Sequence, residues 1–115
     1  MTLRVAVTGA SGRMGQAVAL AVAADTNAEL VSLIARPGSD LVGQPIHSVC
    51  ASVTSDRAVR DSLDLENIDV VIDFTLPEST LVNAEACARA GVPVVIGTTG
   101  FSESQQALLN DCLAP

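Results

Sequence analysis

Three glycines, Gly9, Gly12 and Gly15, lie between a short apolar run and an alanine-rich stretch near the start of the chain. The run at residues 3–7 is rich in β-branched side chains, which predicts a buried strand. The stretch at residues 13–24 carries Ala, Leu, Met and Gln, which favour a helix. Gly9 can take the positive φ of a tight turn, Gly12 lets backbone approach a pyrophosphate, and Gly15 lets the helix pack closely. Strand, turn and helix together predict a dinucleotide-binding loop.

The spacing of this turn, G-x-x-G-x-x-G, differs from that of many dehydrogenases because Ser11 takes the place of their middle glycine. The helix that follows would offer unpaired backbone N–H groups to an anion. The alternative is a glycine-rich turn that binds no ligand. A P-loop is excluded because no Gly-Lys-Ser/Thr follows. The chain contains no lysine, which also excludes Schiff-base chemistry and lysine nucleophiles within it.

Strand-like and helix-like segments alternate along the rest of the chain. Further strands are expected at residues 29–35, near 52–54, at 69–74 and at 92–97. Further helices are expected at residues 56–65, at 78–90, and from the capping box of Ser102 and Gln105 to about residue 113. Residues 36–50 are rich in proline and glycine and predict a loop. The alternation predicts an α/β fold: a Rossmann-type doubly wound parallel sheet with strand order 3-2-1-4-5.

Composition and charge indicate a compact domain and argue against nucleic-acid and membrane partners. With 49% hydrophobic and 17% charged residues, the chain predicts one compact domain over residues 1–115. A formal net charge of −7 has the wrong sign for binding a nucleic-acid backbone or an anionic membrane surface, so neither is an expected partner. The longest apolar run, residues 17–24, is too short to span a membrane, and no signal-peptide pattern opens the sequence. We therefore expect a cytoplasmic protein.

The three cysteines and the single histidine offer little for a metal site. Cys50, Cys87 and Cys112 are odd in number and form no C-x-x-C motif, so reduced thiols without a metal are expected. Cys87 shares a predicted helix face with apolar residues and is interpreted as a core residue. His47 lies in the loop of residues 36–50, where exposure is favoured over a catalytic role. No cysteine is assigned to catalysis.

The residues after the second predicted strand bear on cofactor choice. NAD-binding domains commonly place an Asp or Glu about 20 residues after the glycine turn, where it binds the adenine ribose. Here Ala35 takes that position and Arg36 follows, so no carboxylate repels a 2′-phosphate and a guanidinium can hold one. This pattern favours NADPH over NADH, or the use of both. The alternative for Arg36 is a solvated loop side chain.

Candidate ligand contacts also lie at two other predicted strand ends, because ligands of open α/β sheets bind beyond the carboxyl ends of the strands. Phe74 and Phe101, the only aromatic residues, either line a cofactor crevice or anchor loops, and Phe74 is taken as a cofactor-binding candidate. Thr75 and residues 97–100 could contact ribose and nicotinamide. Asp73 could join them or only cap the following turn.

Three segments together point to a known family. Gly9-Ala-Ser-Gly-Arg-Met-Gly15, Asp73-Phe-Thr-Leu-Pro77 and Gly97-Thr-Thr-Gly-Phe101 closely resemble the amino-terminal domain of bacterial 4-hydroxy-tetrahydrodipicolinate reductases. The resemblance covers essentially the whole chain. It implies an enzyme of lysine and diaminopimelate biosynthesis, usually a homotetramer, that uses NADH or NADPH to reduce a cyclic imine-type dicarboxylate to tetrahydrodipicolinate.

The resemblance also implies roles for individual residues. It assigns the nicotinamide side of the cofactor to Gly97, Thr98 and Thr99, and the adenosine 2′-position to Arg36. The residues that it assigns to the pyrophosphate are Gly9, Ala10, Ser11, Gly12, Arg13 and Met14.

The chain departs from the family pattern at three points. Ala35 replaces the acidic neighbour of the family's arginine, which weakens the case for tight NADH recognition. The family's substrate domain, with a His-His pair and a lysine, is absent, and so is the next strand of the cofactor domain with its Asn-Phe segment. We therefore expect a truncated cofactor domain that has no catalytic residue and is inactive alone. Two other interpretations stay open: the cofactor domain of another NAD(P)-dependent dehydrogenase, and a stand-alone NADP(H)-sensing module.

Overall fold

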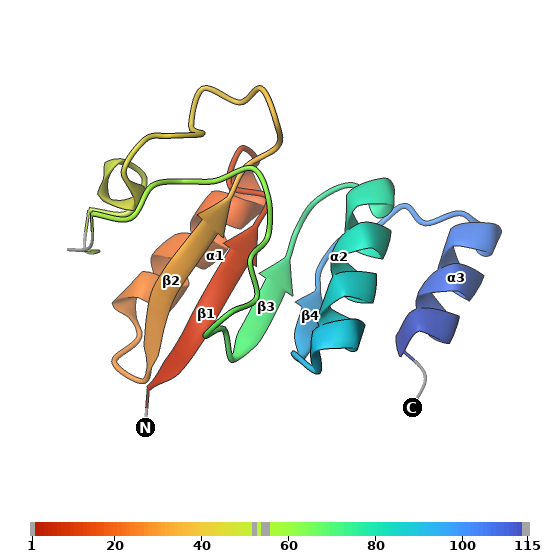
Figure 1. Cartoon of the computed structure of the whole chain (residues 1–115). Helices are drawn as coiled ribbons and strands as arrows, with labels where there is room; N and C mark the ends of the chain where they lie inside the picture. Colours follow the sequence, from red (N-terminus) through yellow and green to blue (C-terminus); the bar gives the residue numbers. More distant parts are fainter. Residues whose placement is uncertain (1, 52, 54–55, 114–115) are drawn as a thin grey trace.

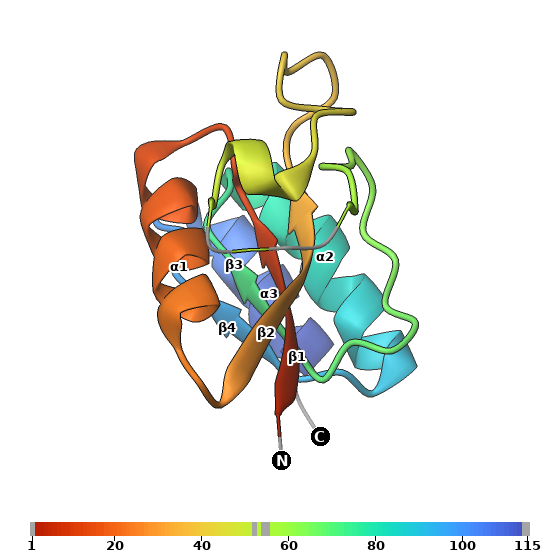
Figure 2. The ribbon, with the colours of Figure 1, turned by 90° about the vertical axis from the view of Figure 1, so that its left-hand side faces the viewer.

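The computed structural model describes residues 2–51, 53 and 56–113. It contains a four-stranded parallel sheet in the order β2-β1-β3-β4 (Figure 1). In chain order the elements are β1 (Leu3–Thr8), α1 (Arg13–Ala24), β2 (Ala28–Ile34), the 3-10 helix η1 (Ile46–Ser48), β3 (Val70–Asp73), α2 (Pro77–Ala90), β4 (Val94–Ile96) and α3 (Glu103–Leu113). Figure 2 shows α1 and α2 on opposite sides of the sheet, and α3 packs against α2.

Side-chain alternation along β1 supplies a core to each face of the sheet. Val5 and Val7 are buried in one cluster with Ala19 of α1. Ala6, between them, is buried in the other cluster with Cys87 of α2. Burial on both faces explains why residues 5–7 are all apolar, whereas Arg4 lies at the exposed start of the strand. Cys87 is a core residue, as predicted.

The chain adds strands on both sides of β1, and this topology determines where a ligand crevice is expected. From β1 the chain crosses by α1 to β2 on one side, whereas β3 pairs with β1 on the other side and leads by α2 to β4. The strand order therefore reverses between β1 and β3. In open α/β sheets the ligand crevice lies beyond the carboxyl ends of the strands at this reversal.

Several local predictions are confirmed. Helix α1 has the bounds expected from the sequence. The capping box before α3 forms as two reciprocal bonds: Gln105 N donates to Ser102 Oγ at 3.1 Å, and Ser102 N donates to Gln105 Oε1 at 2.9 Å. Helix α2 ends at Gly91 with φ 71°, the left-handed conformation that glycine favours.

The helix expected at residues 56–65 is wrong. Arg60 N donates to Leu33 O at 3.1 Å and Ala35 N donates to Arg60 O at 2.9 Å, so this segment lies extended beside the end of β2. Val59 also exchanges backbone bonds with the 43–44 segment and is buried at 1% exposure. Burial of Val59 and these long-range bonds override the local helix preference.

The observed strand order agrees with the last four positions of the predicted 3-2-1-4-5 sheet. Beyond β2, a single parallel bridge between Ile34 and Arg60 occupies the remaining position. The brief strand expected near residues 52–54 falls on residues 52 and 54, which lie outside the described part of the chain.

Two further findings concern membrane-spanning helices and metal-binding clusters. No described helix combines the length and hydropathy that a membrane span needs. Within the same part of the chain, no group of three or more His, Cys, Asp or Glu side chains could hold a metal ion.

Candidate functional site

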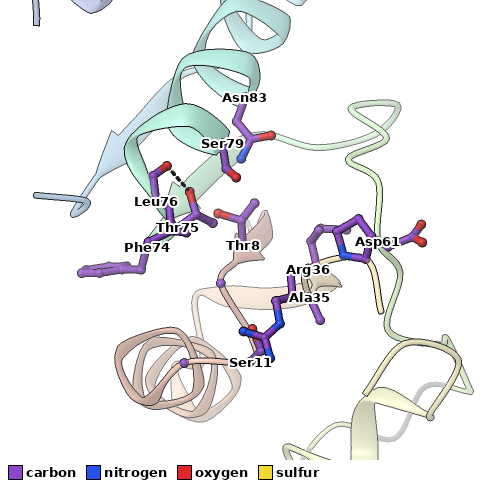
Figure 3. Close-up of a pocket in the computed structure, with 14 residues that line it drawn as sticks. Thr8, Ser11, Ala35, Arg36, Asp61, Phe74, Thr75, Leu76, Ser79 and Asn83 are labelled. Carbon is purple, nitrogen blue, oxygen red and sulfur yellow. Dashed lines mark hydrogen bonds between the residues drawn. The ribbon is translucent and has the colours of Figure 1, made fainter. Parts of the chain in front are cut away.

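A cavity of about 360 Å³ lies at the carboxyl end of the sheet, at the reversal between β1 and β3 (Figure 3). Its walls come from the turn after β1, the end of β2, the segment after Arg60, and the start of α2. The lining residues are Thr8, Gly9, Ser11, Gly12, Ile34, Ala35, Arg36, Pro37, Asp61, Phe74, Thr75, Leu76, Ser79 and Asn83. The cavity thus brings together five of the predicted cofactor-binding residues: Gly9, Ser11, Gly12, Arg36 and Phe74.

The three glycines of the turn differ in what surrounds them. A Cβ on Gly9, which has φ +86°, would lie 1.8 Å from the carbonyl oxygen of Phe74. A Cβ on Gly15 would lie 1.9 Å from the carbonyl oxygen of Gly9, so neither position accepts a larger residue without backbone movement. A Cβ on Gly12 would meet only that same Gly9 oxygen, at 3.6 Å. The space at Gly12 therefore belongs to the cavity, where a ligand could approach the backbone.

The N-terminus of α1 faces this open position with few competing groups. Gly12 is its N-cap, and in the described structure no side chain caps the helix and no acidic residue lies in its first turn. The turn itself is held by Gly12 N, which donates to Gly9 O at 3.0 Å, and by Gln16 Nε2, which donates to Ala10 O at 3.0 Å. A helix N-terminus of this kind is suited to binding an anion.

The other residues predicted around the turn lie outside the lining of the cavity. Ala10 is fully buried, and its N–H donates to Ile34 O at 3.0 Å. Arg13 and Met14 are exposed in the first turn of α1. Their assignment to the pyrophosphate stays a prediction.

Arg36 and Asp61 form the wall at the end of β2. In Figure 3 the guanidinium of Arg36 extends toward Ser11 of the glycine turn. Asp61 reaches the cavity because its neighbour Arg60 pairs with the end of β2. Among the described residues neither side chain forms an ion pair. Sequence reasoning missed Asp61 because it placed this residue in a helix.

The carboxylate of Asp73 is fully buried beside the cavity and accepts hydrogen bonds from five side chains. The donors, which come from β1, from the segment 75–83 at the start of α2 and from the segment after β4, are Thr8 Oγ1 at 2.5 Å, Thr80 Oγ1 at 2.5 Å, Asn83 Nδ2 at 2.9 Å, Thr98 Oγ1 at 3.1 Å and Thr75 Oγ1 at 3.2 Å. All five donors are neutral, and within the described chain no arginine bonds to Asp73. The interpretation that Asp73 only caps a turn is therefore too narrow.

Residues 97–99 lie next to the cavity, against the ring of Phe74. A Cβ on Gly97 would lie 2.1 Å from a carbon of that ring, so a larger residue there requires the ring of Phe74 to move. Gly97 N donates to Asp73 O at 2.8 Å, and Thr98 is buried at 9% exposure. Thr99 is exposed. The predicted nicotinamide residues are thus adjacent to Phe74, although they do not line the cavity itself.

Neither the cysteines nor the histidine are among the described residues that line the cavity. Burial, the charge of Asp73 and Cys112 raise the pKa of Cys87 to about 11. Burial also raises the pKa of Cys50. Both thiols therefore stay protonated near neutral pH and are poor nucleophiles. His47 is exposed on η1, outside the lining of the cavity, as expected.

Comparison with known proteins agrees with this geometry. The family model described as dihydrodipicolinate reductase, N-terminus, matches residues 3–114. A 4-hydroxy-tetrahydrodipicolinate reductase of Thiobacillus denitrificans is 48% identical over 109 residues, which are 93% of this chain and 40% of that protein. The reductase of the same name from Alkalilimnicola ehrlichii is 46% identical over 112 residues, 96% of this chain and 42% of that protein.

A solved structure is similar over the same region. Dipicolinate-bound dihydrodipicolinate reductase from Paenisporosarcina sp. TG-14 superposes with a TM-score of 0.67 at 30% identity and covers 97% of this chain and 43% of that one. The chain therefore spans about two fifths of the length of these relatives.

Proposed function

Because this chain belongs to the family of dihydrodipicolinate reductase amino-terminal domains, we propose that it binds a nicotinamide dinucleotide in the cavity at the carboxyl edge of its sheet. As part of a longer protein it would serve the reduction of 4-hydroxy-tetrahydrodipicolinate to tetrahydrodipicolinate. The proposal rests on one observation: Gly12, which has open space where a side chain would be, lines the same cavity as Arg36. An anion-binding helix N-terminus and a guanidinium together suit the phosphates of such a cofactor.

Different residues of the cavity would contact different parts of the cofactor. The pyrophosphate would lie over Gly12 and accept hydrogen bonds from the first backbone N–H groups of α1. Arg36 would contact the 2′-position of the adenosine. Phe74, which lines the cavity, and the segment 97–99, whose Gly97 lies against the Phe74 ring, would hold the nicotinamide end. The bound cofactor supplies the hydride.

We propose that NADPH binds more tightly than NADH. A hydrogen bond to a charged group contributes about 1.5–3 kcal/mol, so the 2′-phosphate on Arg36 should improve affinity roughly tenfold to a hundredfold. Asp61 works in the opposite direction, because a second negative charge in the same wall disfavours a phosphate. NADH is therefore expected to remain a usable ligand.

Calorimetric titration of the chain with NADPH and with NADH, at one salt concentration, tests both statements. Arg36→Ala should abolish the preference for NADPH, and Asp61→Asn should increase it roughly threefold or more. Asp64→Asn is the matched control, because Asp64 is an exposed acid of the same segment outside the cavity lining. Equal affinities for the two nucleotides before mutation would refute the role of Arg36. Failure to bind either nucleotide would refute the proposed function.

The relatives are longer than this chain. We propose that the substrate that accepts the hydride is bound by the region of the longer protein that this chain does not span. A dicarboxylate acceptor needs cationic or donor groups near the nicotinamide, and its reduction needs a proton donor. The chain has no lysine, its only histidine is exposed outside the cavity, and Arg36 is assigned to the cofactor. We propose on the family resemblance that the longer enzyme acts as a homotetramer in the cytoplasm.

A further inference from the structure

Thr98 stands at a junction that the proposed cofactor contacts do not explain. Its hydroxyl donates to Asp73 Oδ2 at 3.1 Å and accepts the N–H of Thr75 at 2.8 Å. A hydroxyl can do both, whereas an alkyl group can do neither. Because Thr75 follows β3 and Thr98 follows β4, this one oxygen ties the two strand ends together.

Asp73 stabilises the same junction through its backbone and its side chain. Its backbone carbonyl accepts the N–H of Gly97 at 2.8 Å, and its buried carboxylate accepts the hydroxyl of Thr98. Two successive residues of the segment 97–99 are therefore held by one residue of β3. Burial of a carboxylate is costly unless hydrogen bonds replace its water shell, so its donors are held in defined positions.

The junction is next to the nicotinamide end of the cavity and away from the adenosine end. Phe74, between Asp73 and Thr75, lines the cavity and packs its ring on Gly97. Arg36 and Asp61 lie on the wall at the end of β2 and share no hydrogen bond with this junction in the described structure. A change at Thr98 should therefore reach one half of the cofactor and spare the other.

We propose that Asp73 and Thr98 are positioning residues, which hold the segment 97–99 at the distance from the glycine turn that the nicotinamide half of the cofactor requires. This inference rests on the proposed function. It differs from a general structural role in one respect: loss of the Thr98 hydroxyl should weaken the binding of a whole dinucleotide and leave the binding of its adenosine half unchanged.

The test compares two probes by calorimetry on the whole chain: NADPH, and adenosine 2′,5′-bisphosphate as the adenosine half. Thr98→Val keeps the shape of the side chain and removes the hydroxyl. It removes both hydrogen bonds of that hydroxyl, so it should weaken NADPH about tenfold or more and leave the bisphosphate within about twofold. Thr98→Ser should restore NADPH binding, because serine keeps the hydroxyl.

Thr80→Val is the matched control. Thr80 is also buried and also donates to Asp73, at 2.5 Å, and its hydroxyl lies 3.1 Å from Thr75 Oγ1. It lies within α2, however, and in the described structure it forms no hydrogen bond with the segment after β4. Its replacement should lower the melting temperature and leave the ratio of the two affinities unchanged. If Thr98→Val does not fold, Thr98→Cys carries the comparison with a smaller expected loss, since a thiol hydrogen-bonds weakly.

Unchanged NADPH affinity in the Thr98 variant would overturn the inference, and so would an equal loss for both probes, which would indicate a purely structural role. A wild-type chain that binds the bisphosphate and not NADPH would also overturn it while leaving the adenosine site intact. A wild-type chain that binds neither probe would overturn the proposed function, and the inference with it.

Discussion

The glycine turn allows binding and folding to be separated by two substitutions. Gly12→Val adds a side chain to a residue with φ −100° and ψ 162°, an extended conformation that valine adopts readily. Its Cβ would meet only the Gly9 oxygen at 3.6 Å, an ordinary contact. Gly9→Ala instead adds a Cβ 1.8 Å from the Phe74 oxygen at φ +86°. The first change should block the cavity, and the second should damage the fold.

The expected magnitudes follow from these contacts. For Gly12→Val, a weaker N-cap costs up to about 1 kcal/mol and the stiffer unfolded chain returns about 0.4–1 kcal/mol, so stability should hardly change. The pyrophosphate would lose roughly two charge-assisted bonds of about 1.5–3 kcal/mol each, which lowers affinity at least about a hundredfold. For Gly9→Ala, the positive φ alone costs about 1–2 kcal/mol, and the backbone shift adds to it.

Gly38→Ala separates the two costs at Gly9. Gly38 also has φ +86°, yet nothing lies within 4 Å of the Cβ that alanine would add. Thermal denaturation should therefore show a moderate loss for Gly38→Ala and a lowering of about 10 °C or more for Gly9→Ala. NADPH titration then completes the comparison for Gly12→Val. Retained binding in Gly12→Val would remove the pyrophosphate from this turn, and loss of its cooperative melting would show that Gly12 is structural.

Two further predictions concern catalysis and pH. The 115-residue chain should bind NADPH without oxidising it in the presence of freshly generated substrate, whereas a version extended by the family's substrate domain should show turnover; similar rates for both would place the catalytic groups in this chain. Because the pKa of Cys87 is raised in the folded chain to about 11 from the ordinary 9.0, the folded state is favoured fully below pH 9 and less as the pH rises from 9 to 11. Urea denaturation across that range should show a fall that Cys87→Ala reduces; an equal fall in both proteins would contradict the assignment.

Local sequence was sufficient to predict the elements that form the glycine-turn side of the cavity. The strand, turn and helix from β1 to α1 follow from β-branched residues, glycines and an alanine-rich stretch, and α1 begins and ends where expected. The roles expected for Gly9 and Gly15 agree with the close contacts that a Cβ would make at each. The strand, the helix and the contact at Gly15 depend on residues close together in sequence, whereas the contact at Gly9 is with Phe74, a distant residue.

Contacts between distant residues were beyond the reach of the same reasoning. Asp73 is 65 positions from Thr8 and 25 from Thr98, and nothing in the sequence around these hydroxyls indicates that they share one acceptor. Only the parallel register, which pairs Thr8 with Asp73 and Asp73 with Ile96, brings these groups to one edge. The sequence therefore showed hydroxyl side chains at several strand ends, but it did not predict that they all donate to the carboxylate of Asp73.

The segment 56–65 shows how one misplaced element hid a cavity residue. Its local composition favours a helix, and a helix there gives Asp61 no reason to approach Arg36. The structure instead pairs Arg60 with Ile34 at the end of β2, so that Asp61 comes just after a strand-like segment and reaches the crevice. Asp61 therefore lies beyond the carboxyl end of a strand-like segment, as Arg36 lies beyond β2 and Phe74 beyond β3, which is where open α/β sheets bind ligands. The cavity wall that contains Ala35 thus also contains an acidic residue from a segment 26 positions later, which is recognisable only from its pairing.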